Sequence, residues 1–272
     1  MRTEAMFLRV PHGGRRFALF HEPEGAARAL ALYIHPFAEE LNKSRRMAAL
    51  QARSLAEAGF AVLQLDLLGC GDSSGDFGDA SWDAWIEDIL FGIGWLRSQA
   101  DAPLWLWGLR AGCLLAADAA RRLDAPCHLL CWQGMASGAI GLKQFLRLKT
   151  AAQLLDGKER GAMQALQQRS RAGESIDIAG YTLSSALATG FERSTQEPSS
   201  QVARLEWLEV STQANADLSP ASTACLDRWR RSGTLVSSRV VQGPAFWQTT
   251  EIEEAPALLE ATHAVLAEVI SA

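Results

Sequence analysis

The chain has 272 residues, of which 48% are hydrophobic, and a formal net charge of −5. An α/β chain of this length commonly forms one unit around one large core, so we expect a single domain over residues 1–272. Acidic and basic residues are scattered along the sequence, which excludes the basic face of a nucleic-acid binder. The first residues lack the apolar core of a signal peptide, and no window reaches the roughly 18 apolar residues of a membrane span. We therefore expect a cytoplasmic protein.

Apolar residues recur in a pattern that predicts alternating strands and helices. Two short segments, 7–10 and 16–20, alternate apolar and polar residues and predict an antiparallel hairpin at a sheet edge. Further strands are expected at 29–34, 61–66, 104–109, 128–133, 205–210 and 235–241, and helices at 43–58, 81–99, from 111 to about 123, 220–231 and 252–270. Such repeated units imply a mostly parallel sheet of about eight strands with helices on both faces.

Residues 134–200 interrupt this alternation. The segment is rich in Ala, Gln, Arg and Gly and has helical periodicity at 143–155 and 159–171. An insertion between two core strands usually covers the site instead of joining the sheet. The segment is therefore predicted to form a helical cap.

The stretch 104–112 indicates a buried strand that turns sharply into a helix between Gly108 and Gly112, as in a G-x-S-x-G nucleophile elbow. Arg110 occupies the nucleophile position, and a guanidinium stays protonated at any working pH, so it cannot attack a substrate. A cation at a helix N-terminus opposes the helix dipole, and burying it unpaired would be costly. Arg110 must therefore meet an anion.

Two kinds of anion can pair with Arg110. Internal carboxylates come first, with Glu39 and Glu40 on the loop beside the elbow as the leading candidates and Asp217, Glu209 and Glu251 behind them. A ligand anion, such as a sugar acid, phosphate or acyl carboxylate, is the second kind, because a guanidinium binds carboxylates and phosphates through two parallel hydrogen bonds. An internal pair predicts a closed site, whereas a ligand predicts an open pocket.

The other two members of a Ser-His-Asp triad are only partly present. The loop at 242–247, where the histidine would follow the last strand, contains none, and His263 lies about a dozen residues into the final helix. Asp217 is a candidate acid and Glu209 a second one, although an acid at Asp217 also suits the first turn of the helix that follows. Ordinary triad chemistry is therefore not expected.

A replacement nucleophile has little support. Cys113 is predicted to be buried within the elbow helix and inert. Ser73, Ser74 and Cys70 lie on a loop near the site without an identifiable base, for which His35 is the only nearby candidate. A covalent mechanism with an unusual catalytic set stays as an alternative.

No metal or cofactor is expected. The five cysteines are odd in number and lie mostly in apolar runs, which indicates reduced, buried thiols. Cys127 and Cys131 lie four apart on a predicted strand, roughly 13 Å from each other, which is too far to share one zinc ion. Gly69 and Gly71 suggest a dinucleotide motif, but the next helix begins near Ser81, too far along the chain to hold a pyrophosphate.

Three motifs at the ends of three consecutive strands together resemble the α/β-hydrolase superfamily. They are the loop at 35–37, similar to an oxyanion-hole loop, the D-x-x-G-x-G-x-S turn at 66–73, and the elbow at 108–112. The segments 35–47, 108–110 and 243–252 further resemble the exosortase A system-associated hydrolase 2 family. That resemblance implies an α/β-hydrolase fold and an association with bacterial exopolysaccharide biosynthesis and the exosortase system.

Three functions are compatible with these residues. The first is a non-catalytic protein that binds an anionic saccharide or acyl precursor, the second is a scaffold for biosynthetic enzymes, and the third is a hydrolase or acyltransferase acting on esters or thioesters. The residues expected to line the pocket or bind the ligand are Arg110, Ala111, His35, Phe37, Glu39, Glu40 and Trp247.

Overall fold

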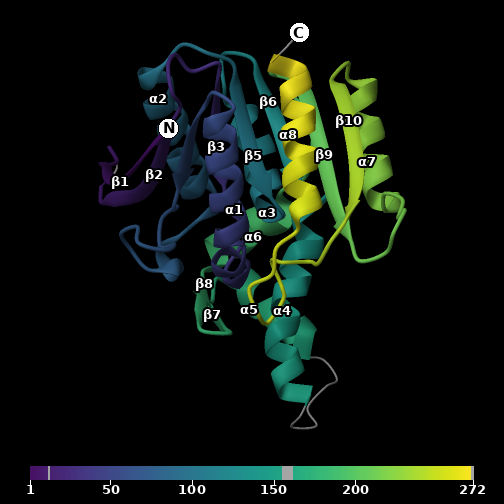
Figure 1. The fold of residues 1–272 in the computed structure, drawn as a ribbon. Helices are drawn as coiled ribbons and strands as arrows, with labels where there is room; N and C mark the ends of the chain where they lie inside the picture. Colours follow the sequence, from purple (N-terminus) through teal and green to yellow (C-terminus); the bar gives the residue numbers. More distant parts are fainter. Residues whose placement is uncertain (12, 155–161, 271–272) are drawn as a thin grey trace.

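The computed structural model describes residues 1–11, 13–154 and 162–270. Eight strands form one sheet in the order β1-β2-β4-β3-β5-β6-β9-β10 (Figure 1). Their bounds are β1 Arg2–Arg9, β2 Arg15–Glu22, β3 Ala29–Ile34, β4 Phe60–Leu65, β5 Leu104–Leu109, β6 Cys127–Trp132, β9 Val202–Ser211 and β10 Leu235–Gln242.

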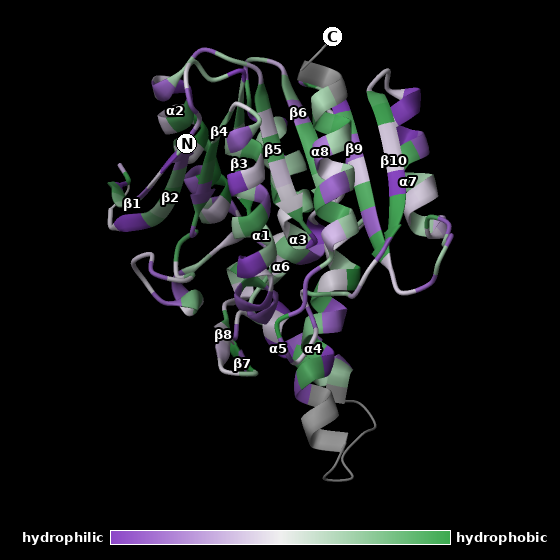
Figure 2. Cartoon of the chain, viewed as in Figure 1, coloured by the Kyte–Doolittle hydropathy of each residue, from purple (hydrophilic) through white to green (hydrophobic). Residues whose placement is uncertain are grey.

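In this sheet β2 runs opposite to the other seven strands. β1 pairs antiparallel with β2, and β2 pairs antiparallel with β4, whereas β4, β3, β5, β6, β9 and β10 run parallel. The central strands are buried on both faces and consist mainly of apolar residues, shown green to white in Figure 2. The predicted α/β class, the number of strands and the hairpin at the sheet edge are confirmed.

Helices cover both faces of this sheet. The helices that flank it are α1 Glu39–Glu57, α2 Trp82–Gln99, α3 Ala111–Ala120, α7 Pro220–Arg231 and α8 Pro256–Ile270. Helices α2, α3 and α7 share one hydrophobic cluster with the sheet, and α1 and α8 share the cluster on the opposite face. Because consecutive parallel strands end at the same edge, the loops that follow β3, β5, β6 and β10 meet there.

Two of the helices that flank the sheet start away from their predicted positions, and in the insertion the helix predicted over 143–155 starts at Gly138. The helix expected from residue 43 begins at Glu39, because Ala38 adopts a left-handed φ of 50° and turns the chain abruptly into α1. The helix expected from residue 252 begins at Pro256, a residue whose fixed φ suits the first helical position. The first correction brings Glu39 and Glu40 into the first turn of a helix at the site.

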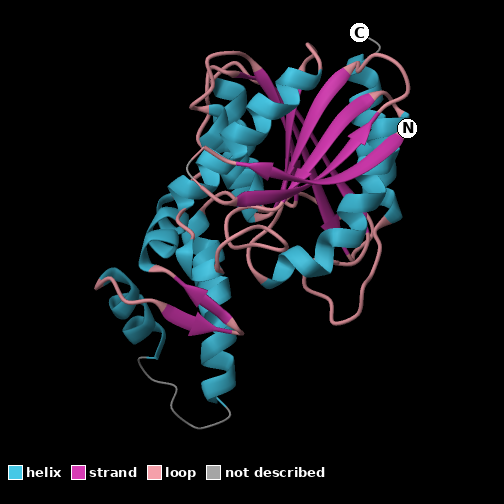
Figure 3. Cartoon of the chain, turned by 90° about the vertical axis from the view of Figure 1, so that its left-hand side faces the viewer, coloured by secondary structure: helices cyan, strands magenta, loops and turns pink. Residues whose placement is uncertain are grey.

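The insertion between β6 and β9 contains more than helices. Its elements are α4 Gly138–Leu154, α5 Ala162–Arg171, the strands β7 Ile176–Ile178 and β8 Tyr181–Leu183, and α6 Ser185–Arg193. The β7–β8 hairpin was not predicted, although Ala179 and Gly180 form a two-residue turn in which both have positive φ. Of the helix predicted over 159–171, the part before residue 162 lies outside the described residues. These elements project from the sheet edge where the parallel strands end (Figure 3).

Candidate functional site

Arg110 lies at the tip of a strand–turn–helix elbow between β5 and α3. Its φ of 55° and ψ of −116° are strained for a non-glycine residue, and it is the N-cap of α3. The flanking glycines allow this geometry. A Cβ on Gly108 would come within 2.5 Å of the Cys113 nitrogen, and one on Gly112 within 2.2 Å of the Ile34 carbonyl oxygen. The predicted elbow is present, with a guanidinium in place of a hydroxyl.

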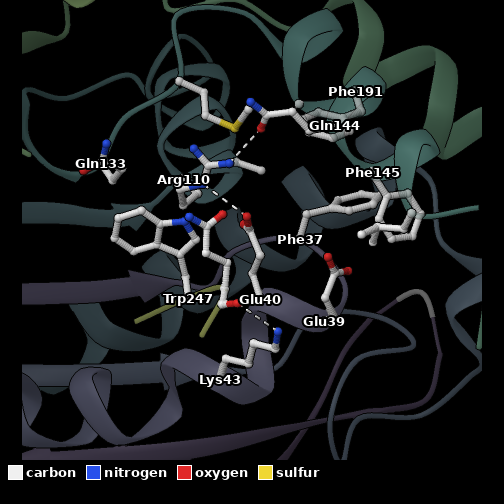
Figure 4. A pocket seen from close by; sticks show the side chains of 15 residues that line it. Phe37, Glu39, Glu40, Lys43, Arg110, Gln133, Gln144, Phe145, Phe191 and Trp247 are labelled. Atoms are coloured by element: carbon white, nitrogen blue, oxygen red, sulfur yellow. Dashed lines mark hydrogen bonds and ion pairs between the residues drawn. The ribbon is translucent and has the colours of Figure 1, made fainter. Parts of the chain in front are cut away.

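The Arg110 side chain is held by partners from three parts of the chain (Figure 4). Its Nε donates to Glu40 Oε1 at 3.2 Å, and a terminal nitrogen donates to Gln144 Oε1 on α4 at 2.9 Å. Its Cζ lies 5.7 Å from the ring centroid of Trp247, a cation–π contact. The side chains of Arg110 and Glu40 are 15% and 16% exposed, so the ion pair is shielded but still reached by solvent.

Burial shapes the electrostatics of the two carboxyl groups. It raises the pKa of Glu40 to about 7, and the Arg110 cation only partly opposes this shift. Burial also raises the pKa of Glu39, whose Oε2 atom is buried and has no hydrogen-bond partner. Near neutral pH the site therefore holds a permanent cation beside a carboxyl group that is only partly ionised.

A cavity of about 630 Å³ surrounds this ion pair. It lies between the elbow, the first turns of α1, the loop after β10 and the cap. Its lining residues are Phe37, Glu39, Glu40, Lys43, Arg110, Ala111, Gln133, Met135, Gly141, Gln144, Phe145, Leu148, Phe191, Trp247 and Gln248. Six of the seven residues that the sequence named for a pocket are in this set.

His35 is the exception, because it does not line the cavity. Its buried ring bridges two loops: Nδ1 donates to the Pro36 carbonyl at 2.8 Å, and Nε2 accepts from the Leu67 N–H at 3.3 Å. Burial lowers the pKa of His35. Both ring nitrogens are thus used to join the β3 and β4 loops, which fits a structural role instead of a general base.

The turn at 66–73 also serves the fold. Ser73 Oγ donates to the Asp66 carbonyl at 2.5 Å and accepts from the Phe17 N–H, while Ser74 Oγ accepts from the Arg15 N–H. A Cβ on Gly71 would come within 1.9 Å of Asp66 Oδ2. These bonds tie the loop after β4 to strand β2, and neither serine lines the cavity.

The base and acid positions hold no triad. Trp247, buried on the loop after β10, stacks near Arg110 where the histidine of a triad would approach. His263 is exposed on α8. Asp217 is exposed ahead of α7 and does not line the cavity, and Glu209 accepts a hydrogen bond from Trp207 Nε1 at 2.7 Å.

The cap supplies the site residues that the sequence did not reveal, Gln144, Phe145 and Phe191 among them. Phe191 stacks on Phe37 with centroids 4.7 Å apart, and Phe145 meets the same ring edge-on at 5.1 Å. Helical spacing alone gives no sign of which face of a cap helix turns toward the elbow. Gln133, which belongs to no motif, also lines the cavity, as does Lys43, for which segment 35–47 predicted no role.

Among the described residues, no three His, Cys, Asp or Glu side chains gather as a metal site. Cys127 and Cys131 both lie on β6, as their flanks predicted, and are buried. No described helix has the length and hydropathy needed to cross a membrane.

The sheet order, the strained elbow and the insertion before β9 define the α/β-hydrolase fold.

No protein-family model and no curated protein matches the chain. Solved structures do match it. Est1E from Butyrivibrio proteoclasticus, with ferulic acid bound, shares 18% identity and a TM-score of 0.66 over 98% of this chain and 100% of its own. A thermostable carboxyl esterase from Bacillus coagulans shares 16% identity and a TM-score of 0.63 over 100% and 97%. XC6422 from Xanthomonas campestris, an a/b serine hydrolase without lid, shares 16% identity and a TM-score of 0.60 over 100% and 97%. At these identities the likeness establishes the fold.

Proposed function

We propose that this chain is a non-hydrolytic protein of α/β-hydrolase fold that binds an anionic small molecule at Arg110. One observation carries the proposal: a guanidinium stands at the tip of the elbow and lines a cavity of about 630 Å³. A serine hydrolase needs a nucleophile, a base within hydrogen-bond reach and an acid that orients the base. Arg110 and Trp247 stand at the first two of these positions.

Charge in the cavity favours an anion as the ligand. Arg110 stays protonated at any working pH, and Lys43 adds a second cation to the lining. Burial raises the pKa of Glu40 to about 7, so near neutral pH its carboxyl group is only partly ionised and binds Arg110 less strongly than a full carboxylate would. The Ala111 N–H, in the first turn of α3, is a further donor of the kind that anions seek at helix N-termini.

The resemblance to the exosortase A system-associated hydrolase 2 family suggests the setting. We propose that the protein serves bacterial exopolysaccharide biosynthesis in the cytoplasm, and that its ligand is an acidic precursor such as a sugar acid, a phosphosugar or an acyl group. Biosynthetic enzymes are the expected protein partners. No cofactor or nucleic acid enters this proposal.

A scaffold with a sealed site is the second candidate. The Arg110–Glu40 ion pair favours it, because an internal carboxylate already occupies the guanidinium at 3.2 Å. In that case the cavity binds nothing, and only the outer surface of the fold acts. A hydrolase or acyltransferase with a non-standard catalytic set is the third, and its turnover of esters or thioesters would be measurable.

Calorimetric titration with glucuronate, glucose 1-phosphate, butyrate and acetyl-CoA tests the proposal. We expect at least one of these anions to bind the wild type, and Arg110→Gln to weaken that binding by roughly 30-fold or more, since a charged partner largely shielded from solvent is lost. The exposed Arg193 supplies the control, Arg193→Gln, which removes the same charge outside the cavity. Binding that Arg110→Gln leaves unchanged would contradict the proposal, and no binding at all would favour the scaffold.

An assay on p-nitrophenyl esters and acyl thioesters tests the enzyme alternative. We expect the wild type to give no turnover above the buffer rate. Turnover that disappears in Arg110→Ala and persists in Arg193→Ala would replace the binding proposal with a catalytic one.

A further inference from the structure

The cavity around Arg110 has two chemically different walls (Figure 4). One wall, here the apolar wall, is made of carbon-rich side chains, most of them from the cap: Phe37, Met135, Phe145, Leu148 and Phe191. The other, here the polar wall, comes mainly from the core: Glu40, Lys43, Arg110, Gln133, Gln144 and Gln248. Glu39 also lines the cavity and lies on the side of Phe37 and Phe145 (Figure 4). The figure places Arg110 and Trp247 toward one side and the three phenylalanines toward the other.

The apolar wall is rigid and offers no hydrogen bonds. Phe37 is held between Phe191, which stacks on it, and Phe145, which meets it edge-on. All three rings are buried, so their positions are fixed by mutual packing. A ligand hydroxyl turned toward this wall would lose its water without gaining a partner, which is costly.

Several side chains of the polar wall already form hydrogen bonds within the protein. Gln133 Oε1 accepts from the Val210 N–H at 2.8 Å, Lys43 Nζ donates to the Gln248 carbonyl at 3.4 Å, and Gln144 Oε1 accepts from Arg110. Arg110 itself is bonded to a carboxylate, Glu40 Oε1, at 3.2 Å. A carboxylate on a ligand can therefore accept from Arg110 the same hydrogen bond that the Glu40 carboxylate accepts now.

We propose that the ligand is a carboxylic acid with an apolar body, whose carboxylate replaces that of Glu40 at Arg110 while its body lies against the apolar wall. This inference rests on the proposed function and names the ligand class of the same site. A polyhydroxylated sugar acid fits less well, because one face of it would meet the apolar wall. Glu40, displaced from Arg110 and still flanked by Glu39, takes up a proton when the acid binds.

Binding of three acids measures this preference: 3-phenylpropanoate with an aromatic body, octanoate with an aliphatic body, and glucuronate with hydroxyls all round. We expect one or both apolar acids to bind roughly tenfold or more tightly than glucuronate. The neutral 3-phenylpropanamide should bind weakly, since it lacks the charge that Arg110 recognises. Titrations in two buffers of different ionisation enthalpy should report proton uptake near pH 7.5, and Glu40→Gln should abolish it.

Two exposed aliphatic residues of α4 provide a matched pair of variants. Leu148 is 41% exposed and lines the cavity, whereas Ile140 is 52% exposed and does not. Because both are exposed, neither substitution should unfold the chain. Leu148→Gln should weaken binding of the apolar acid about threefold to tenfold, and Ile140→Gln should leave it unchanged.

The outcomes separate this inference from the proposed function. Glucuronate that binds as tightly as the apolar acids, with the dependence on Arg110 intact, would overturn the ligand class and leave anion binding in place. Equal effects of Leu148→Gln and Ile140→Gln would also overturn it. Apolar acids whose affinity ignores Arg110→Gln would instead remove the guanidinium from the site and with it the proposed function.

Discussion

Glu40 is the residue whose ionisation most directly changes the site. An ordinary glutamate titrates near 4.5, and burial raises the pKa of Glu40 in the folded protein to about 7. The folded state therefore holds a proton between these two pH values that the unfolded chain releases. Stability must then fall as pH rises from about 4.5 through about 7, because ionisation leaves a carboxylate that is poorly solvated.

We predict that Glu40→Gln reduces this loss of stability. The free energy of unfolding of the wild type, relative to that of the variant, should fall by at most roughly 3 kcal/mol between pH 5 and pH 8. Urea titrations of both proteins across that range measure the difference. Glu251→Gln, an exposed position outside the cavity lining, is the control and should follow the wild type. A difference that grows in the opposite direction would mean that Arg110 stabilises the Glu40 carboxylate more than burial destabilises it.

Whether a site residue could be predicted from the sequence depends on whether local chain geometry or tertiary packing positions it. Arg110 is readable from the chain because two glycines and a buried strand mark an elbow within nine residues. Its contact with Glu40 follows from the way adjacent parallel strands end together. Gln144, in contrast, reaches Arg110 from 34 residues away on a cap helix, at a rotation that tertiary packing sets. His35 was expected in the pocket because loop proximity does not tell which way a ring points.

At the scale of elements, the elbow depends on close packing between α3 and β3. Gly112, in the first turn of α3, has no room for a Cβ because the Ile34 carbonyl oxygen would lie 2.2 Å away. Gly94, exposed within α2, has nothing within 4 Å of the same atom. The same substitution at these two helical glycines should therefore have opposite effects.

We predict that Gly112→Ala destabilises the protein by roughly 3 kcal/mol or more, since backbone must shift to accept the methyl group. Gly94→Ala should stabilise it by about 0.5–1 kcal/mol, because alanine favours the helix. Chemical denaturation of the two variants and the wild type measures both changes. A small effect of Gly112→Ala would show that the elbow is looser than its geometry indicates.

Apolar periodicity predicted the core elements well, because the residues that each strand and flanking helix buries recur at the spacing of that element. The errors occur where the start of a helix depends on one backbone angle or where an element is very short. Ala38 begins α1 at a left-handed φ of 50°, and an alanine gives no warning of such a turn. The β7–β8 hairpin has only three residues in each strand, too few for a clear alternation.

At the scale of the whole molecule, the cap is a layer held to the core by several aromatic contacts, and the ring of Phe191 makes two of them. The ring of Phe191 on α6 lies between core residues, stacked on Phe37 at 4.7 Å and on Trp82 at 5.4 Å. A Cβ on Gly190 would come within 2.2 Å of the Trp82 side chain, so α6 packs tightly against α2. Gln144 adds a polar connection from α4 to Arg110. If the proposed ligand binds here, we expect its binding to be coupled to the position of the cap, because both involve the same wall of the cavity.

We predict that Phe191→Ala loosens the cap while the sheet stays folded. Removing the ring leaves a cavity between cap and core, a loss that costs about 3–5 kcal/mol for a buried phenylalanine. Amide hydrogen exchange should accelerate in α4 and α6 and stay slow in β3 and β5, because the variant loses contacts between cap and core while those within the sheet remain. Arg193→Ala, an exposed change on the same helix, should leave exchange unaltered. An apolar acid that fills the site should increase the protection of the cap in the wild type and do so less in Phe191→Ala, since the acid and the cap share the apolar wall. Acceleration spread equally over the sheet would instead make cap and core one cooperative unit.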